Sequence, residues 1–181
     1  MGAAIRRVVL IGLRRAGKTT VGRLIATKAE WALVDTDAVV ESSTGRSPAD
    51  WIRAEGVERF REVERSVVAR LAGVFDAVIA TGGGVPLSDH NRKALRRDAL
   101  VVYLRAAPWL LAQRASADPA PSGRPPLIGG TPVEEPFVQF ADRDAVYRDF
   151  CDVIADASRP PEDIAAAIID RLGADRQPHS R

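Results

Sequence analysis

The fold is decided by residues 7–26, which read RVVLIGLRRAGKTTVGRLIA. A short aliphatic run ends in Gly12, and a run with helical periodicity begins at Lys18. Between them, the residues from Gly12 to Thr19 fit G-x-x-x-x-G-K-[ST], which in a strand–loop–helix context predicts a phosphate-binding loop. The N–H groups of such a loop and the following helix dipole bind phosphate, the lysine reaches its oxygens, and the Thr19 hydroxyl is a ligand for Mg²⁺. A glycine-rich turn with an incidental lysine is the competing interpretation, which this context disfavours.

Short apolar runs alternate with amphipathic runs along the rest of the chain. The predicted strands are short and aliphatic or β-branched: 7–12, 31–35, 77–83, 99–105 and 151–156. Helical periodicity fills the intervals: 18–29, 57–71, 108–115, 133–150 and 161–172. This alternation predicts an α/β fold with a mainly parallel sheet that is covered by helices on both faces. Because ligands of such sheets bind at the carboxyl ends of the strands, the residues that follow each strand carry the functional expectations.

Length and composition indicate an ordinary single domain. The chain has 181 residues and a net charge of +2, and its charges are interleaved, which argues against a nucleic-acid partner. Cys151 is the only cysteine, so neither an intrachain disulfide nor a cysteine-based zinc site is expected. No stretch is long and apolar enough for a membrane span, and the first apolar run is too short for a signal peptide. We therefore expect a cytoplasmic monomer that acts on small molecules.

Two stretches that follow predicted strands are candidate functional sites. Asp35 and Asp37 end the second strand, where one carboxylate would support Mg²⁺ and the other would accept a proton or hydrogen bond from an acceptor hydroxyl. A helix cap is the alternative interpretation of this D-x-D pattern. Gly82, Gly83 and Gly84 follow the third strand and would let the main chain approach a ligand closely. A tight strand-to-helix turn is the alternative there.

Three arginines are the remaining candidates. Arg61 and Arg143 lie in predicted helices among acidic residues, and each is open to two interpretations. One is a solvated ion pair with an acid on the same helix face, such as Glu64 beside Arg61, and the other is an arm of a bidentate carboxylate clamp. The segment 115–132 is rich in Pro, Gly and Ala and carries one basic residue, Arg124, which together predict a functional lid.

In the order and spacing of its motifs, the chain resembles the shikimate kinases, small P-loop kinases of the nucleoside-monophosphate-kinase type. The resemblance runs nearly end to end, and these segments carry it: VVLIGLRRAGKTTVGRLIA, VDTDAVVE, GVERFREVE, VIATGGG, VVYLR, GRPPL and RDAVY. It implies one domain, 1–181, with a three-layer fold in which helices flank a five-stranded parallel sheet. It also implies a substrate-binding helical part at about 36–65 and a mobile lid at about 115–131.

The resemblance further implies transfer of the ATP γ-phosphoryl group to the 3-hydroxyl of shikimate with Mg²⁺, in aromatic amino-acid biosynthesis. The residues it implies for the nucleotide are Gly12, Arg15, Ala16, Gly17, Lys18, Thr19, Thr20, Arg114, Arg124 and Arg159, of which Arg114 and Arg159 would border adenine. Those implied for shikimate are Asp37, Arg61, Gly82, Gly83, Gly84 and Arg143. Thr19 and Asp35 would hold the metal. The implied catalytic residues are Lys18, the general base Asp37, and Arg124, which would reach over the phosphates from the lid.

Arg14 and Arg15 depart from the family pattern, which usually has an apolar residue and a glycine there. Because the position of Arg14 lies toward the acceptor in that family, its charge is expected to alter acceptor affinity or choice. Two other functions remain open at this point: a ligand-sensing domain of this fold without turnover, and a P-loop kinase for another small acceptor such as gluconate or a nucleoside monophosphate. The two aspartates and three arginines favour the enzyme.

Overall fold

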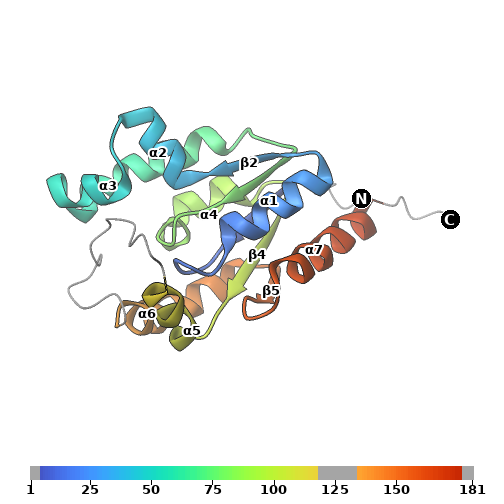
Figure 1. The fold of residues 1–181 in the computed structure, drawn as a ribbon. Helices are drawn as coiled ribbons and strands as arrows, with labels where there is room; N and C mark the ends of the chain where they lie inside the picture. The colour runs from blue at the N-terminus through green and yellow to red at the C-terminus, as the bar shows by residue number, and fades with distance from the viewer. Residues whose placement is uncertain (1–4, 118–133, 177–181) are drawn as a thin grey trace.

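The computed structural model describes residues 5–117 and 134–176, which form a parallel sheet with helices on both faces (Figure 1). The strands are β1 (Arg7–Ile11), β2 (Ala32–Asp35), β3 (Ala77–Ala80), β4 (Ala99–Arg105) and β5 (Val153–Asp156). They lie in the order β2-β3-β1-β4-β5, and every neighbouring pair is parallel. The predicted fold class is confirmed. The third and fifth strands are shorter than predicted, because β3 ends before the glycines and β5 begins at Val153.

Helices connect the strands and cover the sheet. They are α1 (Lys18–Ala29), α2 (Thr36–Thr44), α3 (Pro48–Leu71), α4 (Asp89–Arg96), α5 (Pro108–Ser116), α6 (Glu135–Phe150) and α7 (Pro161–Arg176), with a 3₁₀ turn, η1 (Val85–Leu87). Helices α1 and α7 pack side by side on one face, and α3 packs beside α4 on the other (Figure 1). The hydrophobic periodicity did not predict α2 or α4, and α3 begins at Pro48 rather than at residue 57. Helix α2 and the first half of α3 fall within the helical part at about 36–65 that the resemblance implies. Gly56 kinks α3 with a φ of 82°, which interrupts the apolar periodicity at that point.

The main hydrophobic core lies on the central strands. Every residue of β1 and β3 is buried, as is typical of a parallel sheet covered on both faces. A second, smaller cluster of Val40, Phe60 and Val67 packs α2 against α3. These two helices therefore have apolar contacts of their own, apart from those that hold the sheet.

Arg7 is fully buried at the amino end of β1, inside the main core. Its guanidinium donates to main-chain carbonyl oxygens where α3 and α4 end: Leu71 at 3.0 Å, Ala72 at 3.2 Å, Ala94 at 3.1 Å and Arg97 at 2.8 Å. The last carbonyls of a helix lack partners within it and form the negative end of its dipole, so a five-donor cation suits them. Burial lowers the pKa of Arg7, and the charge of Asp98 opposes that shift.

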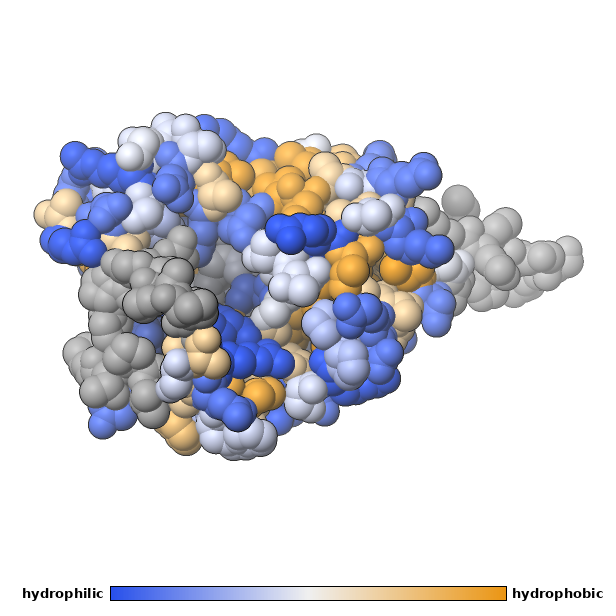
Figure 2. Space-filling model, in the orientation of Figure 1, coloured by the Kyte–Doolittle hydropathy of each residue, from blue (hydrophilic) through white to orange (hydrophobic). Residues whose placement is uncertain are grey.

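The face of the molecule drawn in Figure 2 is mainly polar. Hydrophilic residues predominate there and interrupt the apolar areas. No helix within residues 5–117 and 134–176 is long and apolar enough to cross a membrane.

Candidate active site

The loop between β1 and α1 has the conformation of a tight glycine-framed turn. Gly12 and Gly17 have φ values of 143° and 93°, and a Cβ atom on Gly12 would lie 2.6 Å from the carbonyl oxygen of Leu104. Arg15, between them, has a φ of 64°, in the left-handed region that favours glycine. A side chain in that region costs roughly 1–2 kcal/mol, so the loop keeps its shape against a local strain at Arg15.

Lys18, the first residue of α1, folds back over this loop. Its Nζ donates to the carbonyl oxygens of Gly12 at 2.8 Å and Leu13 at 2.7 Å. Burial lowers the pKa of Lys18 to about 8; the aspartates at the start of α2 oppose this shift, and the cations Arg14 and Arg143 add to it. The pKa of Lys18 therefore lies close enough to neutral pH for a bound anion to change the fraction of the amine that is protonated.

Asp35 caps α2 and faces the phosphate loop at the same time. Its Oδ1 accepts from the backbone N–H groups of Asp37 at 3.0 Å and Ala38 at 3.4 Å. Its Oδ2 accepts from the hydroxyl of Thr19 at 2.8 Å. The helix-cap interpretation of the D-x-D pattern is therefore correct for Asp35, and the capping bonds hold its carboxylate in the orientation that meets Thr19.

Among the cavities at the carboxyl ends of the strands, two adjoin each other. The larger, of about 420 Å³, is lined by Arg14, Arg15, Gly17, Lys18, Thr19, Thr20, Asp35, Asp37, Ala38, Glu41, Thr81, Gly82 and Gly83. The smaller, of about 40 Å³, is lined by Arg14, Asp37, Pro48, Ala49, Ile52, Phe60, Arg61, Glu64, Gly82, Gly83, Gly84 and Arg143. Four residues line both: Arg14, Asp37, Gly82 and Gly83. We call the larger one the loop cavity and the smaller one the acceptor cavity; they meet at Asp37.

The three consecutive glycines form the floor of the acceptor cavity. A Cβ atom on Gly82 would lie 2.6 Å from Oδ1 of Asp37, one on Gly83 would lie 3.4 Å from Nη1 of Arg143, and one on Gly84 would overlap the guanidinium of Arg61. None of the three has a positive φ, so the chain needs their small size here and not their conformational freedom. The glycines let the polar side chains of the site lie directly on the main chain.

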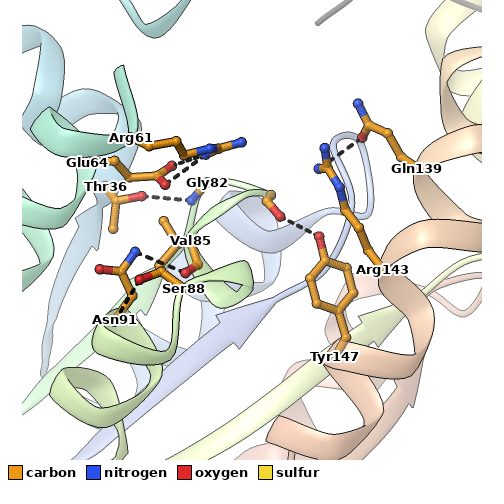
Figure 3. Close-up of polar contacts among 11 residues, drawn as sticks. Thr36, Arg61, Glu64, Gly82, Val85, Ser88, Asn91, Gln139, Arg143 and Tyr147 are labelled. Carbon is orange, nitrogen blue, oxygen red and sulfur yellow. Dashed lines mark hydrogen bonds and ion pairs between the residues drawn. The ribbon is translucent and has the colours of Figure 1, made fainter. Parts of the chain in front are cut away.

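Arg61 and Arg143 reach into the same space from opposite sides, from α3 and α6 respectively (Figure 3). Nη1 of Arg61 donates to both carboxylate oxygens of Glu64, at 2.9 and 2.8 Å. The Glu64 side chain is only 4% exposed, so this is a buried pair and not the solvated one that the spacing also allowed. Burial raises the pKa of Glu64, and the charge of Arg61 opposes the shift. Arg143 is also buried, and its Nη1 donates to Oε1 of Gln139 at 3.3 Å.

The arginines expected near adenine, Arg114 and Arg159, lie on α5 and on the turn between β5 and α7. Arg114 donates to the carbonyl oxygens of Arg15 at 3.0 Å and Ala157 at 2.8 Å, which joins the phosphate loop to the turn between β5 and α7. Arg159 lies on that turn and pairs with Asp163 at 3.5 Å. Neither arginine is among the described residues that line the loop cavity.

Of the remaining predicted site residues, Ala16 lies in the phosphate loop and Arg124 lies outside the described residues. Ala16 is buried, and its N–H donates to the carbonyl oxygen of Leu13. Arg124 and residues 118–131 of the predicted lid lie outside the described residues, beyond α5.

Sequence reasoning missed the side chains that support the two arginines. Glu64 was considered only as a surface partner of Arg61, although its spacing of three residues was the correct signal. Gln139 and Tyr147 lie four residues to either side of Arg143, which places all three on one face of α6. That spacing was visible in the sequence, but nothing in it indicated that this face of the helix is buried.

Comparison with known proteins gives one family over nearly the whole chain. A family model for shikimate kinase matches residues 14–173. Two proteins named shikimate kinase, from Oleidesulfovibrio alaskensis and Symbiobacterium thermophilum, are 39% and 42% identical to this chain. The first match covers 94% of this chain and 99% of the relative, and the second covers 91% and 95%.

Solved structures give the same result. The shikimate kinase of Acinetobacter baumannii, solved in complex with shikimate, is 29% identical with a TM-score of 0.87, and the match covers 97% of each chain. A gluconokinase from Sinorhizobium meliloti is 16% identical with a TM-score of 0.54 and covers 97% of this chain and 100% of its own, which supports only a shared fold. On the family match and the near-complete relatives, this chain belongs to the shikimate kinase family.

Proposed function

We propose that this protein transfers the γ-phosphoryl group of ATP to the 3-hydroxyl of shikimate, as an ATP:alcohol phosphotransferase of aromatic amino-acid biosynthesis. One observation carries the proposal: the loop cavity and the acceptor cavity meet at the carboxylate of Asp37, with Arg61 and Arg143 both lining the acceptor side. Membership of the shikimate kinase family supports it independently.

On the nucleotide side, the chain supplies charge and orientation. The loop N–H groups and the amino end of α1 bind the phosphates, and the Lys18 ammonium exchanges its two loop carbonyls for phosphate oxygens. Phosphoryl transfer needs positioning and charge neutralisation more than covalent chemistry, so these groups provide most of what the reaction requires.

The Thr19 hydroxyl and the Asp35 carboxylate fit a magnesium ion bound together with ATP. They are hard oxygen ligands, they already lie 2.8 Å apart, and Mg²⁺ typically takes one or two protein ligands besides substrate phosphates. The described residues contain no group of three or more His, Cys, Asp or Glu side chains that could hold a metal ion. When bound, the ion would neutralise charge on the phosphates.

On the acceptor side, Asp37 is the general base. Its carboxylate lies over the main chain at Gly82, on the boundary between the two cavities, where the hydroxyl of a bound acceptor would meet the phosphoryl group. Asp37 accepts the hydroxyl proton, while the guanidinium groups of Arg61 and Arg143 bind the carboxylate of the acceptor through their N–H donors.

The rest of the site is part of the same proposal. Arg114 and Arg159 border adenine, and Arg124 reaches over the phosphates from a lid spanning about 115–131. A lid of this kind excludes water that would otherwise hydrolyse ATP. We also propose that the protein acts as a cytoplasmic monomer without nucleic acid or membrane, which sedimentation of the purified protein and cell fractionation test.

A coupled assay of ADP release tests the proposal over a panel of acceptors: shikimate, quinate, gluconate and nucleoside monophosphates. We expect turnover that requires both shikimate and Mg²⁺. Binding of shikimate without turnover would instead establish a ligand sensor. Turnover with another member of the panel alone would retain a P-loop kinase but reject shikimate as its substrate.

A further inference from the structure

A ladder of buried polar side chains runs along one face of α6, at intervals of four residues. It consists of Glu135, Gln139, Arg143 and Tyr147, which are 8%, 2%, 7% and 0% exposed. Nε2 of Gln139 donates to Oε1 of Glu135 at 2.6 Å, and Oε1 of Gln139 accepts from Nη1 of Arg143 at 3.3 Å. At the far end, the hydroxyl of Tyr147 donates to the carbonyl oxygen of Gly83, in the floor of the acceptor cavity (Figure 3).

The two neighbours of Gln139 fix the orientation of its amide. Ionised Glu135 only accepts hydrogen bonds, so it requires the amide nitrogen, and Arg143 only donates, so it requires the amide oxygen. Both demands are met by one orientation, and burial leaves little room for another rotamer. Gln139 therefore holds the Arg143 guanidinium at a defined place on the wall of the acceptor cavity.

The amide also separates charges. Glu135 and Arg143 are eight residues apart, about 12 Å along the helix at 1.5 Å per residue, and the neutral Gln139 lies between them. Within the described part of the chain, the direct contacts of Arg143 are with neutral groups, the Gln139 amide and the Tyr147 hydroxyl. Glu64 lines the same cavity, and its charge acts on Arg143 without a hydrogen bond between them. Arg61 differs, because the buried carboxylate of Glu64 pairs with it directly.

We propose that Gln139 is a positioning and specificity residue: it holds Arg143 over the acceptor cavity without neutralising it, so that Arg143 supplies the net positive charge that selects a carboxylate acceptor. Arg61, neutralised by Glu64, supplies hydrogen-bond donors and geometry. This inference rests on the proposed function only in taking the acceptor to be shikimate.

The test moves the negative charge of Glu135 one turn along the ladder, next to Arg143. Gln139→Glu is made together with Glu135→Gln, because two ionised carboxylates 2.6 Å apart would share a proton, and it is compared with Glu135→Gln alone. Each Gln139→Glu variant below carries both changes. Gln139→Glu is expected to raise the KM for shikimate roughly 10- to 100-fold, since a like charge then competes for Arg143, and to leave the KM for ATP within about twofold. For the uncharged carboxamide analogue of shikimate, the same variant should lose far less, about threefold or less. The ratio of the two acceptors is measured within one protein preparation, so it does not depend on the fraction that is folded.

A matched control and a second variant complete the experiment. Val138→Glu adds the same charge at the neighbouring position of α6, where the side chain is 47% exposed, and is expected to leave both Michaelis constants unchanged. Gln139→Leu removes the hydrogen bonds without adding charge and should raise the shikimate KM about three- to tenfold at unchanged kcat. An unchanged shikimate KM in the Leu variant, or equal losses for shikimate and its amide in the Glu variant, would overturn the proposal.

Failure of the proposed function has a different signature. If the wild-type protein does not phosphorylate shikimate, calorimetric titration with shikimate, quinate and gluconate still measures carboxylate binding. Gln139→Glu must then weaken that binding roughly tenfold or more for the inference to stand.

Discussion

Each end of the sheet has a buried arginine, and the two arginines contact different kinds of group. At the amino end, Arg7 donates to a set of main-chain carbonyls and joins the ends of α3 and α4 to β1. At the carboxyl end, Arg143 contacts a neutral amide and a hydroxyl and lines a cavity. The first arrangement uses the donors of the guanidinium to join parts of the fold, and the second leaves the guanidinium on a cavity wall, where we propose that it binds a carboxylate. Two arginines that are both buried therefore differ in their partners.

Substitution at the carboxyl end should abolish activity without affecting the fold. Asp37→Asn is expected to reduce kcat more than about 100-fold, because the amide keeps the shape of the carboxylate but cannot accept the hydroxyl proton. The measurement is the coupled assay together with thermal unfolding, in which the midpoint should stay within about 2 °C. Glu62→Gln, which removes an exposed carboxylate from α3, is the control and should retain full activity. A near-normal kcat for Asp37→Asn would remove Asp37 from the role of base.

Substitution at the amino end of the sheet should lower stability without affecting the activity of the folded protein. Arg7→Met leaves the buried carbonyls of the α3 and α4 ends without donors, and it is expected to lower the free energy of unfolding by about 3 kcal/mol. For a chain of this size that corresponds to a fall of roughly 6–12 °C in the midpoint of thermal unfolding.

The neighbouring Arg6→Met is the matched control for Arg7→Met. Arg6 pairs with Asp76 while half exposed, so its loss should change stability by less than about 1 kcal/mol. The kcat of each variant per folded molecule should be unchanged, and equal destabilisation by the two substitutions would contradict the structural role of Arg7.

Raising the pH should weaken ATP binding at the carboxyl end of the sheet and, over the same interval, increase the contribution of Lys18 to folding stability. Burial lowers the pKa of Lys18 to about 8 from its ordinary 10.5, so between these values the folded chain binds fewer protons than the unfolded one. The contribution of Lys18 to stability therefore rises with pH in this window. Phosphate binding needs the protonated amine, so kcat/KM for ATP should fall above pH 8, approaching tenfold per pH unit.

Calorimetry of nucleotide binding near pH 8, in buffers of different ionisation enthalpy, checks the titration of Lys18. Proton uptake on binding is expected, since a bound phosphate raises the pKa of the amine. A flat profile of kcat/KM for ATP between pH 7 and 9.5 would contradict the predicted ionisation.

Substitution of Arg14 should have the smallest effect on activity, because Arg14 lines both cavities at their boundary. Arg14→Met is expected to change the KM for the acceptor about three- to tenfold and the KM for ATP less than that. Steady-state kinetics with each substrate varied in turn measures the difference. An unchanged acceptor KM would assign Arg14 to the loop alone.

Much of the fold was predictable from the sequence because each strand is a short, mainly apolar run whose only charged residue, where it has one, lies at an end. The phosphate loop was predictable because its spacing follows from the geometry of phosphate binding. The kinked first half of α3 was not, since Gly56 interrupts its periodicity. The buried ladder of α6 was also missed. Polar side chains at a spacing of four predict a solvent-exposed helix face, and the sequence does not show that tertiary packing buries this one. The same limit applies to Glu64, whose partner was visible in the sequence but whose burial was not.

The floor formed by Gly82, Gly83 and Gly84 has a consequence for how this site can evolve. Asp37 and Arg61 occupy the space where Cβ atoms on Gly82 and Gly84 would be, and Arg143 would be in tight contact with one on Gly83, so a side chain added to the floor crowds or displaces a polar group of the site. New acceptor preferences must therefore arise in the walls, at positions such as Arg14 and Gln139, while the floor stays invariant. In a library of active variants selected on different acceptors, diversity should accumulate in the walls and the three glycines should remain unchanged.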